Sequence, residues 1–152
     1  DKGERLTNPV PFCGNSFDSQ PVLDRNGTAI AYTKPVLVVT DEFSGDFLPA
    51  ALKDAGRGKI YGMSTRASTG FANRASGPAL IETDVIYKEA IMTRREFVSV
   101  PGFPDSPYVE NAGVPVDFEA DFMTEENLRT KGKPFVDGFT KVILDLIASG
   151  QQ

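Results

Sequence analysis

The sequence predicts an α/β protein in which a helix connects two parallel strands. Residues 35–40 (PVLVVT) form a continuous β-branched run, which is typical of a strand buried on both faces of a parallel sheet. Residues 46–55 carry apolar side chains at helical spacing, and residues 58–62 (GKIYG) have the pattern of a short strand. Because such a crossover has essentially one right-handed solution, we predict that residues 35–40 and 59–61 are parallel neighbours, with the helix packed on their sheet.

The ends of this helix are predicted from single residues. Asp46 suits the N-cap, where a carboxylate accepts hydrogen bonds from first-turn amides. Pro49 is tolerated early in the helix because the first-turn amides have no intrahelical partner. Gly56 suits the C-terminal stop, since glycine adopts the left-handed conformation without a steric penalty.

The N-terminal part is predicted to lack regular structure except for one hairpin. Residues 1–20 show no sustained period and are expected to form an arm or loop. Residues 21–32 place Asn26-Gly27 between two short apolar-bearing runs, and this residue pair tolerates the positive φ values of a tight hairpin turn. The lone Cys13 is interpreted as a small apolar filler, with a reactive thiol as the alternative.

After the crossover the sequence predicts two further strands and a second helix. Residues 64–78 are rich in small and polar residues and are expected to form a long loop. Strands are predicted over residues 85–92 and 96–100, followed by a rigid loop at 101–107. An amphipathic helix closed by Gly150 is then expected to pack on the core. Its apolar stripe consists of Phe135, Phe139, Val142, Ile143, Leu146 and Ile147.

Composition and charge exclude several classes of function. The 152 residues fit about one domain and carry 21 acidic against 16 basic side chains, a net charge of −5. Nucleic acid and anionic membrane surfaces are therefore not expected partners. No run approaches the ~18 apolar residues of a membrane span. Because the sequence contains no histidine, it cannot build a Ser-His-Asp triad or a histidine-based metal site alone, and we predict no cofactor or metal.

Chemistry is expected at the turn between the first strand and its helix. A helix N-terminus presents unpaired amides that stabilise an anion, and Ser44 and Gly45 occupy this turn. Two interpretations stay open: Ser44 is a nucleophile with an oxyanion hole of local amides, or its hydroxyl caps the helix. Asp41 and Glu42 are interpreted as solvated turn acids, because adjacent residues on an extended chain point to opposite faces.

Two collinear segments resemble a known family. Residues 34–70, KPVLVVTDEFSGDFLPAALKDAGRGKIYGMSTRASTG, resemble the catalytic segment of the C-terminal-processing serine peptidases, which include the tail-specific proteases and the tricorn protease core. The shared features are the apolar strand, the acidic-aromatic-Ser turn, the ALKD-xGR helix end and the strand that follows. Residues 108–117, YVENAGVPVD, resemble the recurrent ENxGVxPD stretch of that family. The resemblance extends over roughly residues 34 to 147.

The resemblance implies a βα-layered ClpP/crotonase-like fold and hydrolysis of peptide bonds through an acyl-enzyme. It makes Ser44 the candidate nucleophile and places the amides of Gly45 and Asp46 near the oxyanion. It maps the glutamate of the tricorn-like branch onto Glu110, which would orient a histidine supplied from elsewhere. The open alternative for Glu110 is a surface carboxylate that accepts hydrogen bonds from a loop backbone.

The sequence departs from the family at the base and at the turn. An ungapped alignment places Phe43 at the nucleophile position, about three residues before Asp46, whereas a gapped one leaves Ser44 as the nearest hydroxyl. The lysine of the tail-specific branch corresponds to a position near Ser68, and no lysine lies between Lys59 and Lys88. For this shortened turn we expect the Ser44 hydroxyl to cap the helix, accepting an amide hydrogen bond near Phe47 or Leu48.

By the same resemblance the chain, expected to form one domain over residues 1–152, holds the C-terminal part of a peptidase catalytic domain in residues 21–150. We expect it to be inactive alone and to cover its apolar surface with the N-terminal half of that domain or by self-association. Its substrates would be proteins or peptides, and its location periplasmic or secreted. The alternative is a non-catalytic binding or scaffold domain that keeps the peptidase fold.

Overall fold

The computed structural model describes residues 21–66, 70–77, 84–102, 104–110 and 112–150. The chain divides into two compact units, Asp1–Tyr32 and Thr33–Gln152, and each is described by itself. The predicted arm and Cys13 lie outside the described residues. Among the described residues, no helix is both long and apolar enough to cross a membrane.

The first unit contains the predicted hairpin turn. Leu23 and Ala29 form an antiparallel bridge on either side of it, and Gly27 has a φ of 78°. The Asp24 carboxylate accepts hydrogen bonds from the amides of Asn26 and Thr28, each 2.8 Å long. The turn at Asn26-Gly27 is therefore confirmed, with one bridge in place of longer strands.

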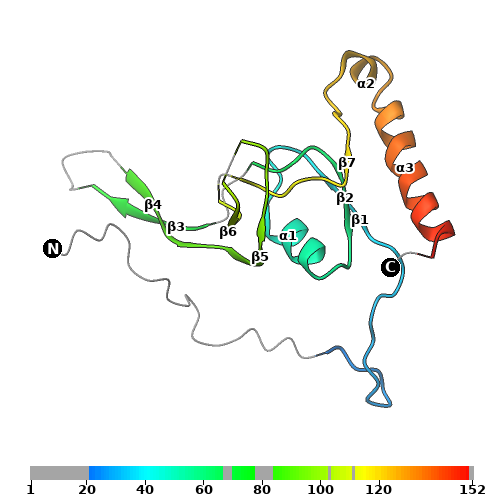
Figure 1. The fold of residues 1–152 in the computed structure, drawn as a ribbon, viewed down its shortest axis with the longest axis horizontal. Helices are drawn as coiled ribbons and strands as arrows, with labels where there is room; N and C mark the ends of the chain where they lie inside the picture. Colours follow the sequence, from blue (N-terminus) through cyan, green and yellow to red (C-terminus); the bar gives the residue numbers. More distant parts are fainter. Residues whose placement is uncertain (1–20, 67–69, 78–83, 103, 111, 151–152) are drawn as a thin grey trace. The chain divides into compact units, whose positions relative to one another are not determined.

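The second unit is built on a parallel sheet of three strands. β1 (Leu37–Thr40), β2 (Lys59–Gly62) and β7 (Phe118–Glu119) lie in the order β1-β2-β7. The register places Leu37 opposite Lys59. Helix α1 (Phe47–Asp54) connects the first two strands and contacts β2. The predicted crossover is confirmed (Figure 1).

Helices cover both faces of this sheet. Ile60 is buried in a cluster with Ala50 of α1, Val109 and Val114. The next residue, Tyr61, points to the opposite face, because successive strand residues alternate. There its ring meets Phe135 of α3 (Lys133–Ala148) edge-on, with the ring centroids 5.3 Å apart. Figure 1 shows α1 and α3 on opposite sides of the sheet.

The two ends of the crossover helix differ in how they are capped. At its C-terminus Gly56 has a φ of 64°, and its amide donates to the Lys53 carbonyl at 3.0 Å. The Arg57 amide donates to the Leu52 carbonyl at 2.9 Å, which completes a Schellman motif. The predicted stop at Gly56 is confirmed. At the N-terminus Asp46 is the N-cap residue, but its side chain makes no capping hydrogen bond.

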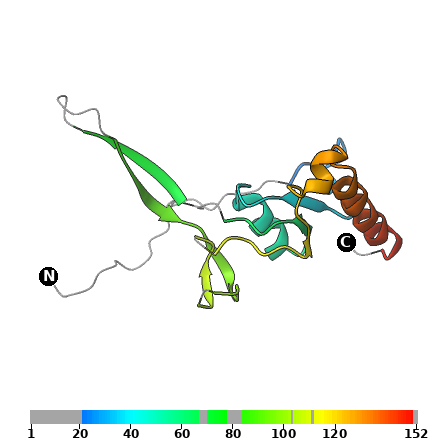
Figure 2. The ribbon, with the colours of Figure 1, turned by 90° about the horizontal axis from the view of Figure 1, so that it is seen from above.

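Two antiparallel pairs accompany the parallel sheet (Figure 2). β3 (Gly70–Ser76) pairs with β4 (Asp84–Ile91), and β5 (Thr93–Val98) pairs with β6 (Ser106–Tyr108). The loop predicted over residues 64–78 is therefore wrong in its second half. The segment lacks apolar alternation, but its backbone groups pair with β4 whatever side chains it carries.

A short helix sets the start of α3. α2 (Glu125–Arg129) begins at Thr124, whose hydroxyl accepts from the Asn127 amide at 3.2 Å. Asn127 is buried; its side-chain nitrogen donates to the Asp121 carbonyl at 3.0 Å, and its side-chain oxygen accepts from the Phe135 amide at 3.0 Å. This buried amide links α2 to the first turn of α3. The predicted C-terminal helix is confirmed.

Gly62 at the end of β2 provides a test of the strand pairing. Its φ is 120°, and a Cβ atom there would lie 2.1 Å from the Thr40 carbonyl oxygen. We expect Gly62→Ala to lower the free energy of unfolding by at least about 2 kcal/mol in urea denaturation, because both the backbone angle and the close approach oppose a side chain.

Gly45→Ala is the matched control for this substitution. A Cβ atom at Gly45 would meet no atom within 4 Å, and its φ lies outside the left-handed region. Its free energy of unfolding should stay within about 0.5 kcal/mol of the wild type. Equal urea midpoints for the two variants would contradict the described approach of β1 to β2.

Candidate active site

The site is built where β1 and β2 end side by side. Thr40, the buried last residue of β1, donates its hydroxyl to the Met63 carbonyl at 2.8 Å. The Met63 amide donates to the Thr40 carbonyl at 3.0 Å. The segment after β1 and the segment after β2 therefore leave the sheet from the same point.

The turn that carries Ser44 is organised around Asp41. The Asp41 carboxylate accepts from the Phe43 amide at 3.0 Å and from the Ser44 hydroxyl at 2.7 Å. The same hydroxyl accepts from the Asp41 amide at 2.9 Å. Asp41 is thus a turn residue as predicted, though half-buried. Glu42 has a partly exposed side chain, and its Oε1 lies 3.7 Å from Arg66 Nε.

The prediction that Ser44 caps α1 is wrong. Its hydroxyl bonds backwards to Asp41 and not forwards to the amides of Phe47 or Leu48. The physical reason is position, because Asp46 holds the N-cap and Ser44 lies two residues before it. Ser44 is half-buried, and Gly45 is exposed.

Asp46 directs its side chain into the protein. The residue is 2% exposed, and its Oδ1 accepts a hydrogen bond from the Thr65 hydroxyl, which is fully buried. Its Oδ2 is also buried and has no hydrogen-bond partner among the described residues. Asp46 is thus the N-cap residue as predicted, but its carboxylate accepts from a buried hydroxyl of the segment after β2 and not from the first-turn amides.

The surroundings of Asp46 change its acidity. Burial raises the pKa of the Asp46 carboxyl above its ordinary value, and the negative charge of Glu110 raises it further. The Thr65 hydrogen bond and the positive charge of Lys88 lower that pKa, but they do not offset the burial. Asp46 therefore senses the charges of both Glu110 and Lys88.

Thr65 joins this turn to the second motif. Its hydroxyl accepts from the Val114 amide at 2.9 Å, and its own amide donates to the Val114 carbonyl at 3.2 Å. Gly113 permits this approach: its φ is 70°, and a Cβ atom there would lie 1.5 Å from the Thr65 carbonyl oxygen. The two motifs that resemble the peptidases thus meet at a single buried threonine.

Glu110 lies in the same loop and binds a lysine. Its carboxylate accepts from Lys88 Nζ of β4 at 2.9 Å, and the two side chains are 18% and 31% exposed. The alternative prediction, a carboxylate that accepts from loop amides, is thus not the contact seen here. Among the described residues, no hydrogen bond joins Glu110 to Ser44 directly.

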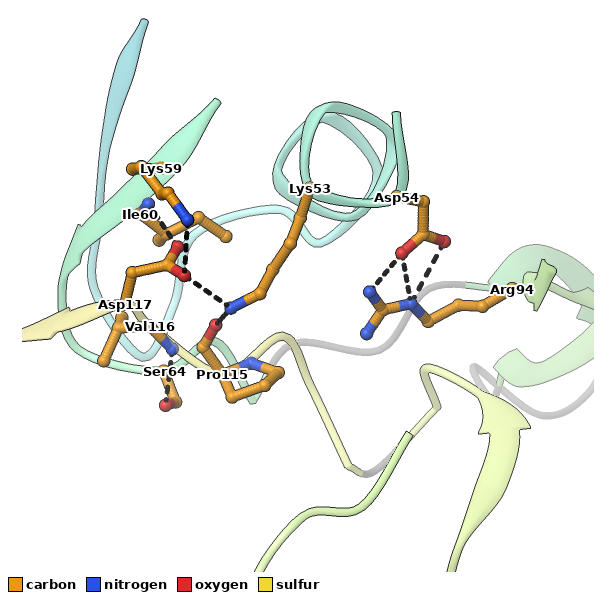
Figure 3. Close-up of polar contacts among 9 residues, drawn as sticks. All are labelled: Lys53, Asp54, Lys59, Ile60, Ser64, Arg94, Pro115, Val116 and Asp117. Carbon is orange, nitrogen blue, oxygen red and sulfur yellow. Dashed lines mark hydrogen bonds and ion pairs between the residues drawn. The ribbon is translucent and has the colours of Figure 1, made fainter. Parts of the chain in front are cut away.

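The other end of the second motif is held by charges (Figure 3). Asp117 Oδ2 accepts from the Ile60 amide of β2 at 2.8 Å, and Asp117 Oδ1 lies 3.5 Å from Lys53 Nζ. Lys53 also donates to the Pro115 carbonyl at 2.5 Å. This end of the motif is therefore fixed to the α1 and β2 crossover, whereas Val114 is fixed to Thr65 after β2.

Sequence reasoning missed Thr65 and Lys88. Thr65 lies in a run of serine and threonine in which no pattern distinguishes one hydroxyl from its neighbours, and Lys88 is one polar residue on a strand. The position near Ser68 lies outside the described residues. Within the part of the chain that is described, no three potential metal-ligating side chains gather.

The raised pKa of Asp46 predicts a stability effect with a definite sign. Between about pH 3.9, the ordinary Asp value, and its raised pKa, the folded protein binds a proton that the unfolded chain has released. Stability from this group is therefore present at low pH and is lost as the pH rises. Because asparagine cannot ionise, Asp46→Asn should become more stable relative to the wild type as the pH rises from 4 to 8.

Urea unfolding of both proteins across this pH range, at one ionic strength, measures the effect. The informative quantity is the difference in unfolding free energy between variant and wild type, because other carboxyl groups cancel in it. A difference that moves in favour of the wild type with rising pH would contradict the burial of an ionisable Asp46.

Comparisons with known proteins give structural neighbours only. No family model matches the chain, and no curated protein sequence matches it. Mature CPAF complexed with lactacystin is 26% identical with a TM-score of 0.67, over 79% of this chain and 22% of CPAF. Mature CPAF in a second crystal structure is 28% identical with a TM-score of 0.59, over 78% and 21%. A serine-to-alanine mutant of CPAF is 28% identical with a TM-score of 0.52, over 75% and 20%.

CPAF is a chlamydial serine protease with a fold like that of the tail-specific proteases. The chain spans about a fifth of the length of the solved CPAF chains. The similarity includes most of this chain, and its helices and strands have the mixed α/β arrangement of a protease structure. The chain is thus related to the serine peptidases through a serine protease-like domain.

Proposed function

We propose that this chain is part of the catalytic domain of a C-terminal-processing serine peptidase, with a ClpP/crotonase-like layering. The observation that carries the proposal is the meeting of the Ser44 turn and the Glu110 loop at Thr65. Thr65 and Val114 are 49 residues apart, each lies in a segment that resembles a peptidase motif, and a buried hydrogen bond joins them. The similarity to CPAF supports the same conclusion.

In the proposed reaction the Ser44 oxygen attacks the carbonyl carbon of a peptide bond. A base removes the hydroxyl proton as the new C–O bond forms, and the amides of Gly45 and Asp46 stabilise the oxyanion. The proton passes to the leaving amine when the C–N bond breaks, and water then hydrolyses the acyl-enzyme. The proposed base is a histidine that Glu110 orients, and since the 152 residues contain no histidine, it would come from outside them.

This assignment requires two contacts of the structure to change. The Ser44 hydroxyl donates to Asp41, so attack requires it to donate to the base instead. Glu110 binds Lys88, and a base must share or replace that partner. Both changes are side-chain movements.

We further propose that activity needs additional protein and that the substrates are proteins or peptides outside the cytoplasm, in the periplasm or secreted. Large apolar side chains on either side of Ser44 support the need for cover: Phe43 is 89% exposed and Phe47 is 69% exposed. Such surface is usually covered by another protein segment or a second copy. The rest of a peptidase catalytic domain would cover it and supply the base.

The second candidate function is a non-catalytic binding or scaffold domain with the peptidase fold. The contacts of Ser44 and Glu110 favour it, because each group is held by a partner within the chain, Asp41 and Lys88. In such a domain both contacts would be permanent and structural.

A fluorophosphonate probe separates the two functions. In the parent protein, with all parts of the catalytic domain present, we expect the probe to modify Ser44, as located by mass spectrometry, because only an activated serine reacts. Lactacystin, bound to CPAF in a solved structure, should compete with the label. Ser44→Ala should abolish labelling and lower peptide hydrolysis at least about 10³-fold.

Ser149→Ala is the matched control, since the Ser149 hydroxyl donates to the Leu146 carbonyl at 3.0 Å at the end of α3. It should be labelled like the wild type. A parent protein that folds and is never labelled at Ser44 would support the scaffold function and overturn the peptidase.

Glu110→Gln tests the proposed orienting carboxylate. An amide keeps the shape but cannot stabilise a charged base, so kcat should fall by about 10²-fold or more while KM changes little. Steady-state kinetics on a peptide substrate measures both constants. Glu119→Gln, an exposed carboxylate on β7, should behave like the wild type. Equal kcat values for the two variants would remove Glu110 from the mechanism.

A further inference from the structure

Two buried side chains of the site have no part in the proposed bond-making steps. Asp46 is 2% exposed and Thr65 is 0% exposed, and both lie between the Ser44 turn and the Glu110 loop. We infer that the Asp46 carboxylate and the Thr65 hydroxyl are positioning groups, which hold the Glu110 loop at a fixed place relative to Ser44. The catalytic consequence rests on the proposed function, whereas the mechanical link rests on the contacts alone.

The link depends on the direction of one hydroxyl group. A threonine hydroxyl has a single hydrogen to donate and lone pairs to accept with. The Thr65 hydrogen is donated to Asp46 Oδ1, which turns a lone pair toward the Val114 amide at 2.9 Å. Without the acceptor on Asp46 the hydroxyl is free to rotate, and the Val114 amide then loses a fixed partner.

The position of Thr65 reaches Glu110 through contacts of the described residues Val109, Ala112 and Gly113. The Val109 carbonyl accepts from the amides of Ala112 and Gly113, at 3.1 and 2.8 Å. Val109 is fully buried in the core, and Gly113 is in contact with the Thr65 backbone. Glu110 follows Val109 directly, so its backbone is held between a core anchor and the Thr65 link.

Burial of the Asp46 carboxylate costs more free energy than burial of a side chain that only fills space. One carboxylate oxygen is buried without a hydrogen-bond partner, although buried polar groups are normally paired. A protein that needed only a filled space could use an apolar side chain here. An acceptor retained at such a point, between two segments of a candidate site, is the expected pattern where position matters more than stability.

Two pairs of variants in the full chain test the link without any need for activity. Thr65→Val keeps the shape and removes the hydroxyl, while Thr65→Ser keeps the hydroxyl. Asp46→Ala removes the acceptor, while Asp46→Asn keeps an oxygen in the same place. The readout is hydrogen exchange of the Val114 amide, followed by NMR, with thermal unfolding measured in parallel.

We expect exchange at Val114 to become at least about tenfold faster in Thr65→Val and Asp46→Ala, because a buried hydrogen bond is lost. Thr65→Ser and Asp46→Asn should stay within about twofold of the wild type. Unchanged exchange in Asp46→Ala overturns the link, even if Thr65→Val fails to fold. Equal acceleration in both members of a pair also overturns it, because that result reports general loosening.

Kinetics in the peptidase-competent parent protein then test the positioning role. Thr65→Val should lower kcat by about tenfold or more with KM within about twofold, and Thr65→Ser should restore kcat. If the wild type hydrolyses peptides and Thr65→Val keeps full kcat, the positioning role is wrong and the peptidase stands. If Ser44 is never labelled, the peptidase fails, and hydrogen exchange alone decides whether the link exists.

Discussion

The in-register pairing of β1 with β2 is the constraint on which the rest of the site depends. Thr40 lies opposite Gly62, so the two strands end at the same height, and the chain leaves them in neighbouring turns. In open α/β sheets this carboxyl edge is where sites form, because loops from neighbouring strands converge there. The Ser44 turn and Thr65 are therefore close in space although they are distant in sequence. The Asp46 carboxylate accepts a hydrogen bond from the hydroxyl of Thr65, which follows β2.

The ENAGVPVD motif is fastened to this edge by two kinds of contact. At its far end the hydrogen bond from the Ile60 amide to the Asp117 carboxylate is charge-assisted, a class worth about 1.5–3 kcal/mol. The nearby pair of Asp117 with half-exposed Lys59, at 3.8 Å, is worth about 0–1 kcal/mol. The backbone contact therefore outweighs the surface ion pair. At the near end the fastening at Thr65 is fully buried.

Local patterns in the sequence were sufficient for the crossover but not for the site. The β-branched run at residues 35–40 and the glycine at position 56 determine the backbone conformation at their own positions. The elements β1, α1 and β2 could therefore be predicted. The contact of the Asp46 side chain could not be predicted. The N-cap rule considers only neighbouring residues, whereas the carboxylate accepts its hydrogen bond from Thr65, 19 residues away. β3 was missed for a similar reason, because its side chains show no strand pattern and its backbone pairs with a distant segment, β4. Glu110 was reached through resemblance, and its lysine partner only through the structure.

The contact between Ser44 and Asp41 fits either function, but its geometry constrains how a reactive serine would arise. The turn does not depend on the hydroxyl alone, because the Ser44 amide donates to the Asp41 carbonyl at 3.2 Å and the Phe43 amide binds the Asp41 carboxylate. A hydroxyl can exchange partners by rotating about one bond while this backbone stays in place. Release of Ser44 to an incoming base thus leaves the turn, the buried Asp46 and the start of α1 where they are. Under the proposed peptidase function, this geometry would keep the serine inactive in the isolated chain and make it available, without refolding, when a base arrives from another segment.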